Sequence, residues 1–124
     1  VISMFQLTVH DYFSSAHQLK GYKGKCEAVH GHNCRVEVTV QGNALNDIGL
    51  LMDFSDLKKL LKKTIDPLDH VMLNDVEGLR GENPSSEIIA RHIYNRMKEG
   101  LPAGIVMVSV IVWESENARA LYCE

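Results

Sequence analysis

Two histidines separated by a single glycine, His30 and His32, are the residues of this sequence whose spacing most directly suggests chemistry. On a strand, their side chains project from the same face with Cα atoms about 6.6 Å apart, so both imidazoles can reach one metal ion. Chance alone gives roughly 0.3 such pairs among six histidines in 124 residues. A third ligand is therefore needed before the pair predicts a metal site.

His17 is the candidate for that third ligand. It follows the first predicted strand, and an antiparallel hairpin would place it opposite His30 and His32. Three neutral imidazoles that leave a fourth position open to water or substrate form a catalytic zinc arrangement. The alternative is that His17 is a surface residue of the loop between two strands.

Two cysteines flank the histidine pair and allow a different site. Cys26, His30, His32 and Cys34 could close a four-ligand structural site with no place for a substrate. Residues on one face of a strand point in parallel and rarely surround an ion, so Cys34 is expected to pack as a small apolar residue. Cys26 stands in a loop beside lysines, which favour its thiolate. Spacing alone leaves these alternatives open.

The strands that must position these residues follow from the sequence pattern. Alternation of apolar and polar residues predicts strands over residues 5–9 and 32–42, with a basic loop over residues 14–26 between them. β-branched and aromatic residues predict two more strands, over residues 105–114 and 118–123. The longest apolar run lies in the third of these strands and is far too short to span a membrane.

Between the two pairs of strands, the period changes to that of a helix. Within residues 57–65, apolar side chains fall on one side and lysines on the other, and Asp53 or Ser55 could cap this helix. Asn-Pro-Ser-Ser at residues 83–86 predicts the start of a second helix, with its proline in the first turn. This helix is expected to stop near Gly100.

The order of these elements predicts the fold class. The order ββααββ, with hairpins rather than crossovers, indicates an α+β fold: an antiparallel four-stranded sheet with two helices on one face, in a single domain over residues 1–124. Oligomerisation is the simplest way to cover the other face of the sheet.

A net charge of −3 without a long basic run argues against a nucleic-acid partner. Three cysteines and the lack of a secretion signal predict a reducing, cytoplasmic location.

Six segments, read in order, resemble one family of pterin enzymes. The segments FSSAHQL, CEAVHGHNC, MDFSDLK, LDHVMLN, NPSSEIIA and VWES are similar to those of the 6-pyruvoyl-tetrahydropterin synthase / 6-carboxy-tetrahydropterin synthase family, over nearly the whole chain. The resemblance implies the tunnelling fold (T-fold), in which protomer sheets join into an oligomeric barrel with active sites between subunits. It also implies a homohexamer of two stacked trimers, a zinc cofactor and lyase activity on a pterin triphosphate.

The resemblance further implies a role for each residue that matches a family motif. The implied zinc ligands are His17, His30 and His32. The implied catalytic residues are the base Cys26 and the pair Asp69 and His70, a proton relay from a neighbouring subunit. The implied pterin-binding residues are Glu114, Ser85 and Ser86. From the residues alone, the Asp-His pair equally fits a polar turn, the glutamate a solvated strand end, and the two serines a helix cap.

The residues before the histidine pair indicate which branch of the family the chain resembles. Cys26, four positions before His30, resembles the branch that converts 7,8-dihydroneopterin triphosphate to 6-carboxy-5,6,7,8-tetrahydropterin, a queuosine precursor, with release of acetaldehyde and triphosphate. Glu27, three positions before His30, resembles the folate branch, which makes 6-hydroxymethyl-7,8-dihydropterin. The chain thus resembles a hybrid CExxHGH subgroup in which Glu27 is a second catalytic candidate or only a solvated neighbour of lysines.

Alternatives to the 6-carboxy-tetrahydropterin synthase activity stay open at this point. They are a folate-directed or dual activity, a 6-pyruvoyl-tetrahydropterin synthase activity, and a zinc- or pterin-binding module without turnover. The chain departs from the family at one position near the site. Cys34 follows HGHN where the family usually has an aromatic residue, and this affects the expected shape of the substrate side rather than metal binding.

Overall fold

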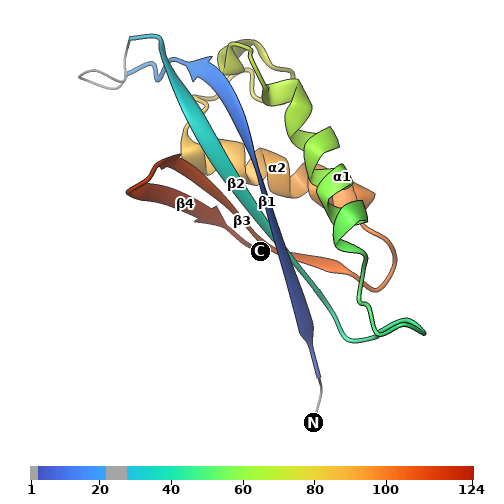
Figure 1. Ribbon diagram of the computed structural model, residues 1–124. Coiled ribbons are helices and arrows are strands. Elements are labelled where there is room, and N and C mark those ends of the chain that lie inside the picture. Colours follow the sequence, from blue (N-terminus) through green and yellow to red (C-terminus); the bar gives the residue numbers. More distant parts are fainter. Residues whose placement is uncertain (1–2, 22–27) are drawn as a thin grey trace.

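The computed structural model describes residues 3–21 and 28–124. These residues form four strands and two helices, in the predicted order ββααββ. In chain order they are β1 (Phe5–His17), β2 (His30–Gly42), α1 (Phe54–Ile65), α2 (Ser86–Gly100), β3 (Val106–Ser115) and β4 (Ala118–Tyr122) (Figure 1). Two short 3₁₀ turns lie between the helices, namely η2 (Asp66–Leu68) and η3 (Leu73–Asp75).

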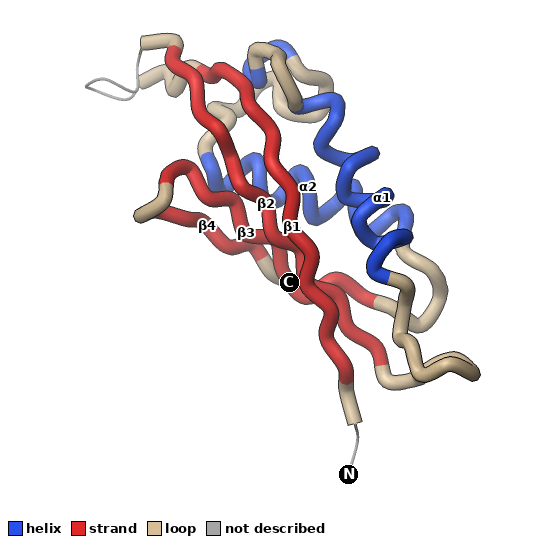
Figure 2. The backbone as a smooth tube through the Cα atoms, viewed as in Figure 1, coloured by secondary structure: helices blue, strands red, loops and turns tan. Residues whose placement is uncertain are grey.

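The strands form one antiparallel sheet in the order β1-β2-β3-β4. The strands β2 and β3 are neighbours in this sheet although both helices separate them in the sequence. Both helices cover the same face of the sheet (Figure 2), which confirms the predicted α+β class. Neither helix of the described chain combines the length and the apolar character needed to cross a membrane.

The core lies between the sheet and the helices. Val36, Val38 and Val40 alternate along β2 toward the helices and have no exposed surface. Each helix contributes side chains four residues apart, which fall on one helical face. These side chains are Leu57, Leu61 and Ile65 of α1 and Ile89, Ile93 and Met97 of α2. The apolar faces predicted from the sequence are the faces that the fold buries.

Side-chain caps fix where the two helices begin. Asp53 caps α1, because its Oδ1 accepts a hydrogen bond of 2.7 Å from the Ser55 N–H. Ser85 caps α2, because its Oγ accepts a hydrogen bond of 3.2 Å from the Ile88 N–H. The prediction that Pro84 lies in the first turn of the second helix is therefore wrong. The serine after it supplies the cap, and the proline stands outside the helix.

The first strand extends well beyond the predicted range, to His17 instead of residue 9. Residues 14–17, predicted as a loop, pair with residues 30–33 of β2. They are polar or small and show no apolar alternation, so the strand is held here by backbone pairing and by a hydrogen bond of 2.6 Å from Ser14 Oγ to Asn33 Oδ1. This extension places His17 inside the sheet.

The connection between the helices runs along the outer edge of this extension. The His70 N–H donates to the Ser14 carbonyl at 2.6 Å, and the Ala16 N–H donates to the Val71 carbonyl at 3.0 Å. Ala16 and Met72 also form an isolated parallel bridge. The end of β1 is therefore held on both sides, by β2 and by the chain that follows α1.

Candidate metal centre and active site

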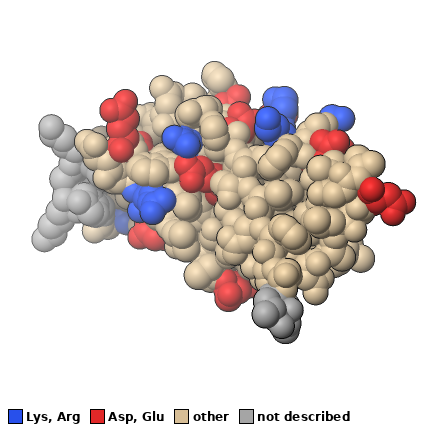
Figure 3. All heavy atoms as spheres, turned by 60° about the horizontal axis from the view of Figure 1, so that its bottom comes forward, with Lys and Arg blue, Asp and Glu red and all other residues tan. Residues whose placement is uncertain are grey.

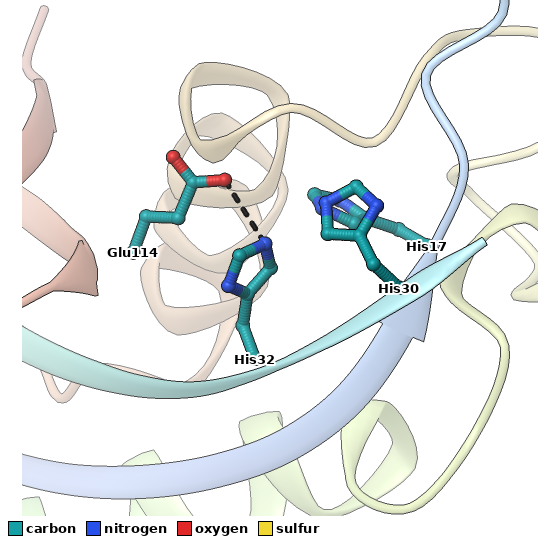
Figure 4. Close-up of side chains that lie close together, drawn as sticks. All are labelled: His17, His30, His32 and Glu114. Carbon is teal, nitrogen blue, oxygen red and sulfur yellow. Dashed lines mark hydrogen bonds and ion pairs between the residues drawn. The ribbon is translucent and has the colours of Figure 1, made fainter. Parts of the chain in front are cut away.

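Three histidine rings meet at one end of the sheet, on the face that the helices cover (Figure 4). His17 ends β1 directly opposite His30, the first residue of β2, and His32 follows on the same face of β2. The ring centroids of His17 and His30 are 4.5 Å apart. The ring centroid of His32 lies 5.0 Å from that of His17 and 4.7 Å from that of His30. The structure thus brings together the three histidines that the sequence pattern suggests as ligands.

Two of these rings have their tautomers fixed by backbone carbonyls. The Nδ1 atom of His17 lies 2.7 Å from the Pro84 carbonyl oxygen, and the Nδ1 atom of His30 lies 2.7 Å from the Ala28 carbonyl oxygen. A carbonyl oxygen only accepts, so each Nδ1 carries a proton and each neutral ring keeps its lone pair on Nε2. Metal-binding histidines usually have this second hydrogen bond.

The same two rings point their Nε2 atoms at each other, 2.9 Å apart. With a proton on each Nδ1, neither neutral ring has a hydrogen to donate across this gap, and two lone pairs face each other. Such an arrangement is stable only with a positive centre between the nitrogens, either an extra proton or a metal ion. The geometry of His17 and His30 therefore fits a metal site.

His32 and Glu114 complete the group. The Nε2 atom of His32 is buried and has no hydrogen-bond partner among the described residues, although Glu114 Oε1 lies 3.1 Å away (Figure 4). Burial lowers the pKa of His32 below its ordinary value. The negative charge of Glu114 raises this pKa by a smaller amount, and the neighbouring His17 and His30 lower it further. The ring is therefore neutral at pH 7, as a metal ligand must be. One donor atom from each of the four residues lies within 4.8 Å of the others. Three imidazoles and one carboxylate suit zinc and similar divalent ions.

Cys34 packs in the core, as predicted, and does not join this group. It is 5% exposed and belongs to the apolar cluster beneath the helices. Burial, and then the negative charge of Glu114, raise the pKa of the Cys34 thiol to about 11. The donor atoms that lie together come from His17, His30, His32 and Glu114, so a closed structural site that includes Cys34 finds no support among the described residues.

Alkylation should reveal this burial directly. At pH 8 a thiol with a pKa of about 11 is only about 0.1% thiolate, so Cys34 of the native protein should resist iodoacetamide. The exposed Cys123 should be labelled under the same conditions, and unfolding in urea should make both react. Peptide mass spectrometry distinguishes the two cysteines. Equal labelling of both in the native protein would contradict the buried position.

Asp69 and His70 form the pair that the sequence suggests. Asp69 Oδ2 lies 2.9 Å from His70 Nδ1, and Asp69 Oδ1 accepts a hydrogen bond of 2.9 Å from the Ser14 N–H. The Ser14 N–H, and then His70, hold the pKa of Asp69 below its usual value. The His70 side chain is 81% exposed and lies at the outer edge of β1. Within one chain, the pair does not join the group of three histidines.

The two serines lie at the start of α2, which adjoins the metal group. The Pro84 carbonyl, which holds His17, immediately precedes Ser85. The Ser85 hydroxyl serves as the helix cap, and Ser86 is the first residue of α2. The residue just before the cap of this helix therefore orients a candidate metal ligand.

Comparison with known proteins identifies the family. The model of the family described as 6-pyruvoyl tetrahydropterin synthase matches residues 6–124. The chain belongs to this family. Its fold agrees with the solved structure of the Caenorhabditis elegans 6-pyruvoyl tetrahydropterin synthase, with a TM-score of 0.87, 27% identity, and coverage of 99% of this chain and 97% of the other. The predicted T-fold of the single chain is thereby confirmed.

Relatives within the 6-pyruvoyl tetrahydropterin synthase family carry different enzyme names. A 6-carboxy-5,6,7,8-tetrahydropterin synthase of Synechocystis is 40% identical over 112 residues, which cover 86% of this chain and 85% of the relative. A dihydroneopterin monophosphate aldolase of Pyrococcus furiosus is 34% identical over 105 residues, which cover 85% of each protein. The prediction of a lyase of this family is confirmed.

Two site residues suggested by the family motif, Cys26 and Glu27, lie outside the described residues. The chain on either side of them is described, up to Gly21 and again from Ala28. Both flanking segments lead to the metal group: the first includes His17, four residues before Gly21, and in the second the Ala28 carbonyl holds His30.

Two asparagines, to which the sequence pattern gave no role at the site, anchor the chain after His17. The Asn74 side chain accepts from the Gln18 N–H at 2.9 Å and donates to the Gln18 carbonyl at 2.9 Å. The Asn83 side chain makes the same pair of hydrogen bonds to Lys20, at 2.9 Å and 2.7 Å. Each side-chain amide therefore hydrogen-bonds both the N–H and the carbonyl of one residue, as the backbone of a neighbouring strand does. Together the two amides fix the path of the chain after β1.

Replacing Asn83 by aspartate should weaken metal binding. The variant keeps the acceptor for the Lys20 N–H but places a negative oxygen against the Lys20 carbonyl, beside the Pro84 carbonyl that holds His17. We expect zinc affinity to fall about tenfold, as is typical when a residue that orients a ligand is lost. A competing zinc chelator measures this change. Asn95→Asp, the same substitution at an exposed site on α2, is the control. Equal affinities in the two variants would contradict the anchoring role.

Proposed function

We propose that this protein is a zinc-dependent lyase. Its proposed reaction converts 7,8-dihydroneopterin triphosphate to 6-carboxy-5,6,7,8-tetrahydropterin with release of acetaldehyde and triphosphate, a step toward queuosine. The observation that carries the proposal is the pair of Nε2 atoms of His17 and His30, 2.9 Å apart with both Nδ1 protons engaged by carbonyls, beside His32. In a family whose members include a 6-carboxy-tetrahydropterin synthase, a metal site open to substrate supports this reaction.

The proposed zinc ligands are His17, His30 and His32, and the metal, when bound, supplies a Lewis acid that makes a substrate hydroxyl more acidic. The chain supplies the proton transfers. We assign Cys26 as the base that removes a carbon-bound proton from the substrate side chain. The sulfur is a suitable base because nearby lysines favour its thiolate.

The proton relay is assigned to Asp69 and His70. With Asp69 Oδ2 2.9 Å from Nδ1, the ring keeps a proton on Nδ1, so Nε2 is the atom that gives and takes protons. Asp69 is itself held by the Ser14 N–H, which fixes the direction of the imidazole. The exposed position of this ring suits a role in the site of a neighbouring subunit.

Glu114 is assigned as the residue that anchors the pterin ring, and Ser85 and Ser86 are assigned to the edge of that ring. The two carboxylate oxygens of Glu114 match the amino and ring N–H donors of a pterin. The first turn of α2 offers free N–H groups to the ring carbonyl, which is the usual property of a helix start. This assignment places the ring next to His32, whose Nε2 lies 3.1 Å from Glu114.

We also propose a homo-oligomer, most simply a hexamer of two trimers, with one domain per chain. The edge strands β1 and β4 have strand partners on one side only, apart from the bridge at Ala16, and could pair with other copies. On the face of the molecule shown in Figure 3, charged side chains lie over the left and upper parts, and a broad area to the lower right is largely uncharged. Such a surface is suited to contact with further subunits.

Incubation with zinc and dihydroneopterin triphosphate, followed by mass analysis of the products, tests the proposed reaction. We expect 6-carboxy-5,6,7,8-tetrahydropterin and acetaldehyde. Accumulation of 6-pyruvoyl-tetrahydropterin would assign the protein to the other synthase branch. Unchanged substrate from folded, zinc-loaded protein would reject an enzyme in favour of a binding module.

A second activity through Glu27 is favoured by two observations. The chain carries a carboxylate directly after Cys26 and resembles the Pyrococcus furiosus aldolase over most of its length. If Glu27 is the base for formation of 6-hydroxymethyl-7,8-dihydropterin, Cys26→Ala should retain that product and Glu27→Ala should lose it. Loss of both products on removal of Cys26 alone would reject the dual activity.

A further inference from the structure

One oxygen of the Glu114 carboxylate points toward the ring of His32, a member of the metal group (Figure 4). It extends from the end of β3, and its Oε1 atom lies 3.1 Å from His32 Nε2. The contact is close, yet its direction does not make a hydrogen bond, and the buried His32 Nε2 has no other partner among the described residues. The two atoms therefore lie side by side, as two ligands of one ion do.

Two of the donor–donor distances agree with four ligands around one centre. With metal–ligand bonds of about 2.0–2.1 Å, neighbouring donor atoms of a tetrahedral zinc site are about 3.3 Å apart. The His17–His30 pair, at 2.9 Å, and the His32–Glu114 pair, at 3.1 Å, are within a few tenths of an ångström of that value. These pairs share no atom, so they correspond to opposite edges of a tetrahedron, and all four donors lie within 4.8 Å of one another.

We propose that Glu114 is the fourth ligand of the ion when no substrate is bound, and that it leaves the ion when a pterin ring arrives. The second half rests on the proposed function, which assigns Glu114 to the ring. One carboxylate cannot saturate the ion and receive the N–H donors of a pterin at once. Ring binding would therefore draw the carboxylate away and open the fourth position to the substrate side chain. The metal would therefore become accessible to the substrate side chain only after the pterin ring has bound.

Cobalt binding tests the first half without any turnover. Co²⁺ takes the same kind of site and has visible absorption that depends on its coordination. We expect Glu114→Gln to weaken Co²⁺ and Zn²⁺ affinity about 10- to 100-fold and to lower the cobalt absorption, because water replaces the carboxylate. Glu116→Gln, the same change at an exposed turn residue, is the control, and thermal unfolding verifies that both variants fold.

A pterin without a side chain tests the second half. Adding 7,8-dihydropterin to the cobalt-loaded protein should change the spectrum toward that of Glu114→Gln, while the spectrum of Glu114→Gln itself should not change. One outcome overturns the inference: Glu114→Gln binds cobalt with the affinity and the spectrum of the unaltered protein, while histidine variants lose the ion. The proposed zinc enzyme would stand in that case. If Glu114→Gln weakens cobalt binding but dihydroneopterin triphosphate is never turned over, the carboxylate ligand stands and the proposed function fails.

Discussion

Zinc affinity is expected to fall by more than about 100-fold when His30 is replaced by alanine, and turnover should fall with it. His30 supplies one of the two Nε2 atoms that face each other at 2.9 Å. Loss of a group that merely orients a ligand typically costs about 10- to 100-fold in metal affinity, so loss of the ligand itself should cost more. Competition with a chromophoric chelator measures the affinity, and product mass analysis measures turnover.

His10→Ala is the matched control for this substitution. His10 is an exposed histidine in the middle of β1, and it lies outside the metal group. The control should bind zinc as the unaltered protein does. Zinc affinity that is unchanged in His30→Ala would reject the three-histidine site, whatever the activity of that variant.

Replacing His70 by alanine should lower kcat by about 10²- to 10⁴-fold, which is the usual contribution of a positioned acid or base. Zinc affinity should not change, because His70 lies at the outer edge of β1 and not in the metal group. Asp69→Asn should act in the same direction through the imidazole that Asp69 orients. Since the pKa of Asp69 is lowered, the carboxylate remains ionised at neutral pH and loses its charge only as the pH falls through that lowered value.

Mixed oligomers provide a sharper test of where His70 acts. His30→Ala and His70→Ala are each expected to have strongly reduced turnover alone. If an active site combines the metal group of one protomer with the relay of another, co-assembly of the two variants should restore part of the turnover. A mixture that assembles but stays inactive would contradict a site shared between protomers.

The sequence predicted the parts of this site that depend on periodicity. The period of two along β2 places His30 and His32 on one face, and antiparallel pairing brings His17 to them. The period of the helices likewise predicted the buried faces around Leu61 and Ile93. Alternating or helical spacing is a property of the sequence itself, so these features could be found without the structure.

Other parts of the site left no trace in the sequence. The atoms that fix the rings of His17 and His30 are backbone carbonyls, and every residue has one. Asn74 and Asn83 look like any loop asparagines until the fold places them beside the chain that leaves β1. The end of β1 is composed of polar and small residues, so its pairing with β2, rather than its own pattern, makes it a strand.

The backbone of His70 has a consequence for efforts to make this protein more heat-resistant. Among the described residues, His70 is the sole non-glycine residue with a positive φ, +56°. A left-handed backbone costs a residue with a side chain about 1–2 kcal/mol, and glycine would avoid that cost. Selection for thermal endurance alone would therefore favour glycine at position 70 and discard the imidazole. Under the proposed relay role, the imidazole at position 70 is present at the expense of backbone stability.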